Sequence, residues 1–96
     1  MYASVTTFEL RGSIDQVLSL IREFLLPAAR SQPGFVDLQV LTNPGLGRTF
    51  LISWWQTEAA LQAAEVQSTY QQAFAQLSTL LTIPPVEGNY VVCLRG

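Results

Sequence analysis

The sequence predicts a two-layer α+β domain in which helices cover one face of a four-stranded antiparallel sheet. Three observations lead to this fold class. The length of 96 residues suits a single domain spanning residues 1–96. Strand-like and helix-like segments follow one another in the order β-α-β-β-α-β. Hydrophobic residues make up 49% of the chain and charged residues 12%, which is more apolar surface than so short a chain buries by itself.

The first strand and the first helix are predicted from local signals. Tyr2 to Leu10 is rich in β-branched and aromatic residues, and Arg11-Gly12 ends this strand. The segment Ser13 to Gln16 is a capping box, in which the serine and the glutamine satisfy free backbone N–H groups at a helix start. Apolar residues at helical spacing continue to Ala29, so we expect Pro27 to kink this helix without ending it.

The two middle strands are predicted to form a hairpin around the turn residues Asn43 to Gly47. Phe35 to Thr42 alternates, with Val36, Leu38 and Val40 expected on one face. Arg48 to Trp55 carries large apolar side chains on both faces: Phe50, Ile52 and Trp54 on one, and Leu51, Ser53 and Trp55 on the other. Because the chain has helices for only one layer, the second face is expected to pack on the sheet of a second copy.

Two capping signals, Thr57 and the box Ser68 to Gln71, predict two helices after this strand. The predicted elements are a short helix from Glu58 to about Val66, a longer one from Ser68 to Leu81 ended by Pro84-Pro85, a turn at Glu87 to Asn89, and a last strand from Tyr90 to Leu94. This order of elements is the split βαβ, or ferredoxin-like, arrangement.

The composition argues against several function classes. A net charge of −2 with only five Lys and Arg residues is unlike a surface that follows nucleic-acid phosphates. One cysteine, Cys93, and no histidine leave no internal disulfide and no common zinc or haem ligand set. No segment is long and apolar enough to cross a membrane, and the first residues are unlike a signal peptide, so we expect a cytoplasmic protein.

Several stretches resemble the antibiotic biosynthesis monooxygenase family. They are LLPAARSQPGF at Leu25 to Phe35, WQTEAAL at Trp55 to Leu61, Ser68 to Tyr70, and Pro84-Pro85 before the last strand. The resemblance spans nearly the whole chain and implies a dimeric α/β barrel, in which the sheets of two subunits pack together. It also implies oxidation of an aromatic or quinol-like substrate by O₂, often without metal or flavin, in an apolar pocket between sheet and helices.

The chain departs from the family pattern where chemistry would occur. Members often carry a histidine nine or ten residues after the motif tryptophan, and this chain has Ala64 and Glu65 there. The asparagine near the first strand of haem-degrading relatives has no counterpart in Val5 to Leu10. These departures argue against haem degradation, and we expect neither a cofactor nor a metal.

Four aromatic residues are candidates for substrate binding. Trp55 lies at the exit of a strand, Tyr70 and Phe74 lie one turn apart on the second long helix, and Tyr90 begins the last strand. Ordinary core packing is the alternative role for Trp55, Tyr70 and Phe74, and it is the commoner role for buried aromatic residues. Tyr90 is a candidate because the start of the last strand can approach the mouth of a cavity. Trp54 is expected in the dimer interface.

A catalytic base in a chain without histidine must be a carboxylate whose pKa is raised by burial. Asp37, among apolar neighbours in a strand, and Glu65, at a position where relatives carry histidine, are the candidates. Two functions are compatible with these residues. One is cofactor-independent monooxygenation of a small apolar aromatic or quinol-like substrate. The other is a non-catalytic homodimer that binds a hydrophobic ligand or is associated with stress.

Overall fold

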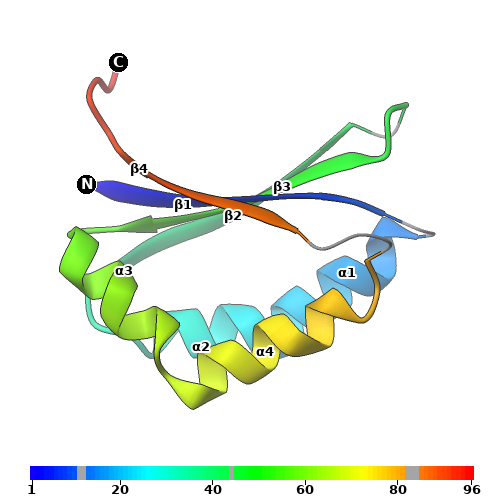
Figure 1. Ribbon diagram of the computed structural model, residues 1–96, viewed down its shortest axis with the longest axis horizontal. Coiled ribbons are helices and arrows are strands. Elements are labelled where there is room, and N and C mark those ends of the chain that lie inside the picture. The colour runs from blue at the N-terminus through cyan, green and yellow to red at the C-terminus, as the bar shows by residue number, and fades with distance from the viewer. Residues whose placement is uncertain (11–12, 44, 82–84) are drawn as a thin grey trace.

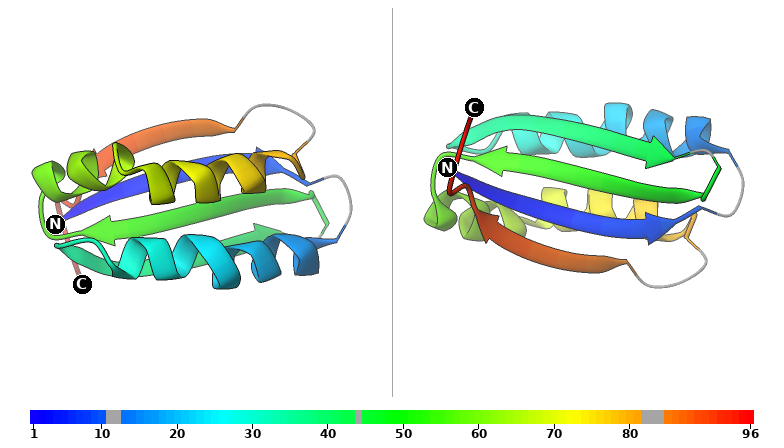
Figure 2. Two further views of the ribbon diagram at one scale, coloured as in Figure 1. Left: turned by 90° about the horizontal axis from the view of Figure 1, so that it is seen from below. Right: turned by 90° about the horizontal axis from the view of Figure 1, so that it is seen from above.

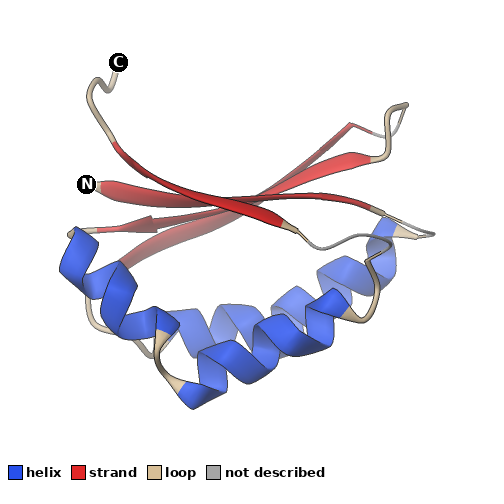
Figure 3. Cartoon of the chain, in the orientation of Figure 1, coloured by secondary structure: helices blue, strands red, loops and turns tan. Residues whose placement is uncertain are grey.

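The computed structural model describes residues 1–10, 13–43, 45–81 and 85–96. Four strands form one antiparallel sheet in the order β2-β3-β1-β4, and the helices lie together on one of its faces (Figure 1, Figure 3). This is the predicted ferredoxin-like α+β fold. The elements are β1 (Tyr2–Glu9), α1 (Ile14–Leu20), η1 (Ile21–Leu25), α2 (Leu26–Arg30), β2 (Phe35–Asn43), β3 (Arg48–Trp55), α3 (Glu58–Glu65), α4 (Ser68–Ser78) and β4 (Val86–Val91).

The first helical region is continuous but changes its winding before Pro27. Ser13 caps α1 by accepting a hydrogen bond from the Asp15 N–H at 3.1 Å, so the predicted helix start is confirmed. The segment η1 is a π-helix, in which the Leu26 N–H reaches back five residues to the carbonyl of Ile21. Pro27 has no N–H and its ring crowds the carbonyl four residues earlier. The wider turn accommodates the proline, and the helix goes on to Arg30.

A β-bulge in β2 corrects the predicted faces of that strand. Phe35 pairs with Trp55 and Asp37 with Trp54, so Val36 is the extra residue. Phe35 therefore joins Leu38 and Val40 on the helix side of the sheet, whereas Val36 is 43% exposed. The alternation in the sequence does not reveal a bulge, because one inserted residue inverts the faces on one side of it.

The second long helix, α4, begins at Ser68 as predicted but ends at Ser78 and not at Leu81, and two further predictions beside it were wrong. The cap of α4 is Gln67 and not Ser68, and the Gln71 side chain donates a hydrogen bond to the carbonyl oxygen of Glu65 at 3.0 Å. The last strand runs from Val86 to Val91 and not from Tyr90 to Leu94, because Thr7 to Tyr2 of β1 pair with Val86 to Val91. The segment predicted as a turn, Glu87 to Asn89, thus lies inside β4.

Some sequence-based predictions concern residues outside the described ranges. These are the break at Arg11-Gly12, the Pro44 part of the hairpin turn, and the helix stop at Pro84. No helix among the described residues is long and apolar enough to cross a membrane.

The helix-facing side of β3 forms the centre of the core. Trp55 and Thr49 are fully buried there, and Leu51 and Ser53 are nearly so. The indole N–H of Trp55 donates a hydrogen bond to the Ser53 hydroxyl oxygen at 3.0 Å, which satisfies its polar group. The Trp55 ring meets Phe35 and Tyr70 edge to face, with ring centroids 5.4 and 6.3 Å away. Trp55 therefore joins β2, β3 and α4.

A second contact joins the start of β2 to α3. Gly34 has a φ angle of +83°, and a Cβ atom at this position would lie 2.6 Å from the Cβ of Ala60. Only glycine fits such a close approach in this conformation. The Gly34 carbonyl also accepts a hydrogen bond from the N–H of Gln56 at 2.8 Å. Thr57 then caps α3 by accepting one from the Ala60 N–H, as predicted.

We expect Trp55→Ala to lower the free energy of unfolding by about 3–5 kcal/mol, the usual effect of removing a large buried aromatic side chain. The control is Phe24→Ala, because Phe24 is 42% exposed and its removal should cost less than about 1 kcal/mol. Urea denaturation at equal protein concentration measures both values. Equal losses for the two variants would contradict the central packing role of Trp55.

Candidate functional site

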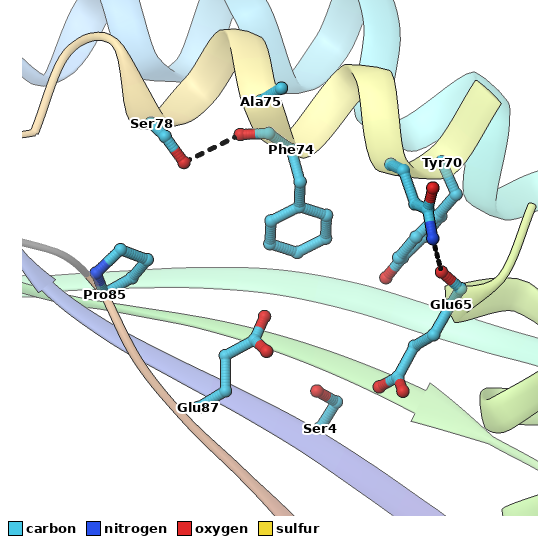
Figure 4. Close-up of a pocket in the computed structure, with 9 residues that line it drawn as sticks. Ser4, Glu65, Tyr70, Phe74, Ala75, Ser78, Pro85 and Glu87 are labelled. Atoms are coloured by element: carbon cyan, nitrogen blue, oxygen red, sulfur yellow. Dashed lines mark hydrogen bonds between the residues drawn. The ribbon is translucent and has the colours of Figure 1, made fainter. Parts of the chain in front are cut away.

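A pocket of about 410 Å³ opens between α4 and the half of the sheet formed by β1 and β4. This volume lies within the range of small-molecule sites. In Figure 2, α4 lies over this half of the sheet, whereas α1, η1 and α2 lie over the half with β2 and β3. The nine lining residues, shown in Figure 4, are Ser4, Glu65, Tyr70, Gln71, Phe74, Ala75, Ser78, Pro85 and Glu87.

The pocket has an aromatic wall and an acidic side. Tyr70 and Phe74 are four residues apart on α4, so their side chains project toward the same side of the helix. Their ring centroids are 5.2 Å apart. Across from them, Glu65 at the end of α3 and Glu87 on β4 extend into the space that faces the two rings (Figure 4). Glu87 is exposed and belongs to the edge strand β4, so it lies at the mouth of the pocket.

The aromatic wall is anchored in the core. Tyr70 is buried, and its ring lies against Trp55, which itself lies against Phe35. Each such edge-to-face pair contributes about 0.5–1.5 kcal/mol beyond the burial of its area. The ring of Phe74, packed against Tyr70, continues this row into the pocket. The wall is therefore pre-organised before any ligand enters.

Glu65 has the electrostatic environment of a weak base. Burial raises the pKa of its carboxyl above the ordinary 4.5, and the negative charge of Glu87 raises it further, while Asn89 acts in the opposite direction. The peptide carbonyl of Glu65 accepts the hydrogen bond from Gln71, which ties the end of α3 to the first turn of α4. This contact fixes the main chain of Glu65 at one end of the pocket, and the carboxyl that it carries has a raised pKa.

Tyr70 is a hydrogen-bond donor at neutral pH. Burial raises the pKa of its hydroxyl to about 12; the nearby Ser53 hydroxyl lowers it, and the charges of Glu65 and Glu87 add to the rise. The Tyr70 hydroxyl therefore keeps its proton at neutral pH. Tyr70 and Glu65 place a donor and an acceptor beside the same space.

Three of the residues predicted for the site line this pocket: Glu65, Tyr70 and Phe74. Trp55 lies behind Tyr70 and is fully buried, so it supports the wall and does not face the pocket. Whether Glu65 acts as a base, and whether the two rings bind substrate, stays a prediction.

The other two predicted site residues lie on the opposite face of the sheet. Tyr90 pairs with Ala3, and the next pair in the ladder is Asn89 with Ser4, which lines the pocket. Successive strand residues point to opposite faces, so Tyr90 points away from the helices, and it is 59% exposed. Asp37 pairs with Trp54, and its carboxylate accepts a hydrogen bond from the Leu38 N–H at 2.8 Å in an exposed position. Neither is among the residues that line the pocket between α4 and the sheet.

Sequence reasoning missed Glu87 and Ser4. Glu87 was assigned to a turn, because Gly88 and Asn89 are poor strand formers. Ser4 was not selected because it lies within a predicted strand and belongs to no recognisable polar motif. A signal was present in the alternation of Ser4 and Thr6 on one face of β1, both of them buried. Small hydroxyl side chains facing a helix layer leave room for a pocket, where larger residues would fill it.

The described residues contain no group of three Cys, Asp or Glu side chains that could hold a metal ion together. The charged side chains among the described pocket residues are two carboxylates, Glu65 and Glu87. What the arrangement offers is proton transfer and hydrogen bonding beside an aromatic surface.

Several solved structures of other proteins resemble this chain over nearly its whole length. The chain is similar in structure to SnoaB, a cofactor-independent oxygenase from Streptomyces nogalater, with a TM-score of 0.83 and 20% identity over 98% of this chain and 94% of that one. A protein from Mycobacterium tuberculosis has a TM-score of 0.77 and 20% identity over 98% and 96% of the two chains. A conserved protein from Methanosarcina mazei has a TM-score of 0.79 and 15% identity over 93% and 89%.

These likenesses establish the fold. A search of curated proteins found no match. The model of one family, described as antibiotic biosynthesis monooxygenase, matches residues 1–77, which include every element from β1 to most of α4. The chain therefore belongs to the antibiotic biosynthesis monooxygenase family.

Proposed function

We propose that the protein is a cofactor-independent monooxygenase that oxidises a small, mainly apolar phenol or quinol with O₂ in the pocket beside α4. The observation that carries this proposal is the meeting of Glu65, a carboxyl with a raised pKa, with the rings of Tyr70 and Phe74 around one open space. Family membership and the likeness to SnoaB support the reaction class.

The pocket favours one orientation of such a substrate. Its ring lies against Phe74, and its hydroxyl points toward the end of the pocket formed by Glu65 and Tyr70. Glu65 then accepts the hydroxyl proton, which leaves an electron-rich phenolate. The Tyr70 hydroxyl, which stays protonated, donates a hydrogen bond to the phenolate oxygen.

The substrate itself supplies the electrons for the oxidation. For a phenol with a free ring C–H para to the hydroxyl, the phenolate passes an electron to O₂, and the two radicals join at the para carbon as a peroxide. Loss of the proton on that carbon and cleavage of the O–O bond leave a quinone and water. One substrate molecule and one O₂ thus give one quinone and one H₂O, with four electrons passing from the ring to O₂.

The direct test measures O₂ uptake and quinone absorbance with 1-naphthol. Glu65→Gln keeps the size of the side chain and removes the base, so we expect kcat/KM to fall about 100-fold. Glu58→Gln is the matched control, because Glu58 begins the same helix, α3, outside the pocket. Full activity of Glu65→Gln would contradict the assignment of the base. Tight binding of 1-naphthol without O₂ uptake would favour the alternative, a non-catalytic domain that binds a hydrophobic ligand.

The rate should depend on pH through Glu65. The base works in its ionised form, so kcat/KM rises with pH as Glu65 loses its proton, with a midpoint above 4.5 because the pKa is raised. Glu87→Gln removes a neighbouring negative charge, and we expect the midpoint to move to lower pH. Tyr70, with a pKa of about 12, stays protonated across this range. An unchanged midpoint in Glu87→Gln would show that the two carboxylates do not interact.

We also propose that two copies of the chain associate through the sheet face that carries no described helix. Phe50, Ile52 and Trp54 of β3 lie on this face and are only half-buried within one chain. Around them, Leu41 is 50%, Val86 70% and Tyr90 59% exposed. An apolar area of this kind marks an interface between proteins.

Sedimentation velocity at micromolar concentration tests this association. We expect a dimer for the unmodified chain and a monomer for Ile52→Glu, which places a charge in the centre of the face. Phe24→Glu, on the helix layer and 42% exposed, should leave the dimer intact. A stable monomer of the unmodified chain would contradict the proposal.

A further inference from the structure

Among the described residues that line the pocket, two carry a negative charge and none carries a positive charge. Glu65 and Glu87 extend into the pocket, and no arginine is among its described lining residues. Helix α4, which forms the opposite wall, contains no charged residue from Ser68 to Ser78. The residues on the helix-facing side of β1 are Tyr2, Ser4, Thr6 and Phe8, and none of them is charged at neutral pH.

The two carboxylates lie at different parts of the space. Glu65 reaches in from the end of α3 at the Tyr70 side, and Glu87 extends from β4 toward Phe74 (Figure 4). A flat ring that lies against Phe74 therefore has a carboxylate near each of its ends. An acidic substituent on the ring is therefore repelled by one of the two glutamates in either orientation of the ligand.

We infer that the pocket selects uncharged aromatic hydroxy compounds and rejects the same ring systems when they carry a carboxylate, with Glu87 as the residue that determines this specificity at the pocket mouth. This inference rests on the proposed function for the class of ring that binds. It goes further in excluding aromatic acids. The reaction that supplies the substrate must accordingly deliver a ring that has no free acid group, such as one that is decarboxylated or esterified.

The size of the effect follows from the position of Glu87. An exposed carboxylate is partly screened by water and salt, so its repulsion of a bound anion is moderate. Glu65 is half-buried and adds to the repulsion wherever it is ionised. Together we expect at least a tenfold preference for the uncharged ligand at pH 7 and low ionic strength.

Calorimetry without O₂ separates binding from turnover. The probes are methyl 6-hydroxy-2-naphthoate and 6-hydroxy-2-naphthoate, which differ in size by one methyl group and in charge by one unit, with 2-naphthol as the parent ring. The unmodified protein should bind the ester at least ten times more tightly than the acid. Glu87→Gln should reduce this ratio at least threefold, and Glu87→Asp, which keeps the charge, should retain most of it. Glu58→Gln, a charge change outside the pocket, should leave it unchanged.

The outcomes separate this inference from the proposed function. If ester and acid bind equally well to the unmodified protein, the selection against acids is wrong, while the binding of aromatic phenols stands. If the ratio is large but the same in Glu87→Gln, then Glu87 does not determine it and the inference fails in that part. If neither the ester nor 2-naphthol binds, the proposed aromatic site fails, and the inference fails with it.

Discussion

The packing of Trp55 between the sheet and the helix layer is the contact on which the rest of the structure depends. Its indole touches Phe35 on β2 and Tyr70 on α4 and donates a hydrogen bond to Ser53 on its own strand. Through Tyr70 the same contact positions Phe74, so the wall of the pocket is an extension of the core. Because protein interiors are densely packed and transmit small displacements, a change at Trp55 should alter the pocket although Trp55 does not line it.

The pocket then combines this aromatic wall with an acidic side. Glu65 ends α3 and Glu87 lies on an edge strand, and the two negative charges act on each other. Burial and the nearby charge of Glu87 destabilise the ionised form of Glu65, which raises the pKa of its carboxyl. The same charges disfavour an anionic ligand. Base strength and ligand choice would thus share one electrostatic cause.

Much of the fold could be predicted from sequence, because it depends on local periodicity. The opposite orientations of Trp54 and Trp55 follow from the period of two in a strand, and Thr57 caps its helix by a local hydrogen bond. The start of β4 could not be predicted, because Gly88 and Asn89 become strand residues only by pairing with β1. That error also concealed Glu87. Glu65 could be predicted because it occupies a position where relatives carry histidine. Tyr90 and Asp37 were chosen from their residue type and place in a strand, and the structure places both on the sheet face opposite the pocket.

We expect an aromatic ligand to lie between Phe74 and the two glutamates, with its hydroxyl toward Glu65. Intermolecular nuclear Overhauser effects between 2-naphthol and the protein, measured without O₂, test it most directly. This position of the ligand predicts contacts from the naphthol ring protons to the Phe74 and Tyr70 rings, with the proton next to the hydroxyl closest to the Glu65 side chain. Contacts to Trp54 or Tyr90 on the other face of the sheet, without any to Phe74, would contradict it.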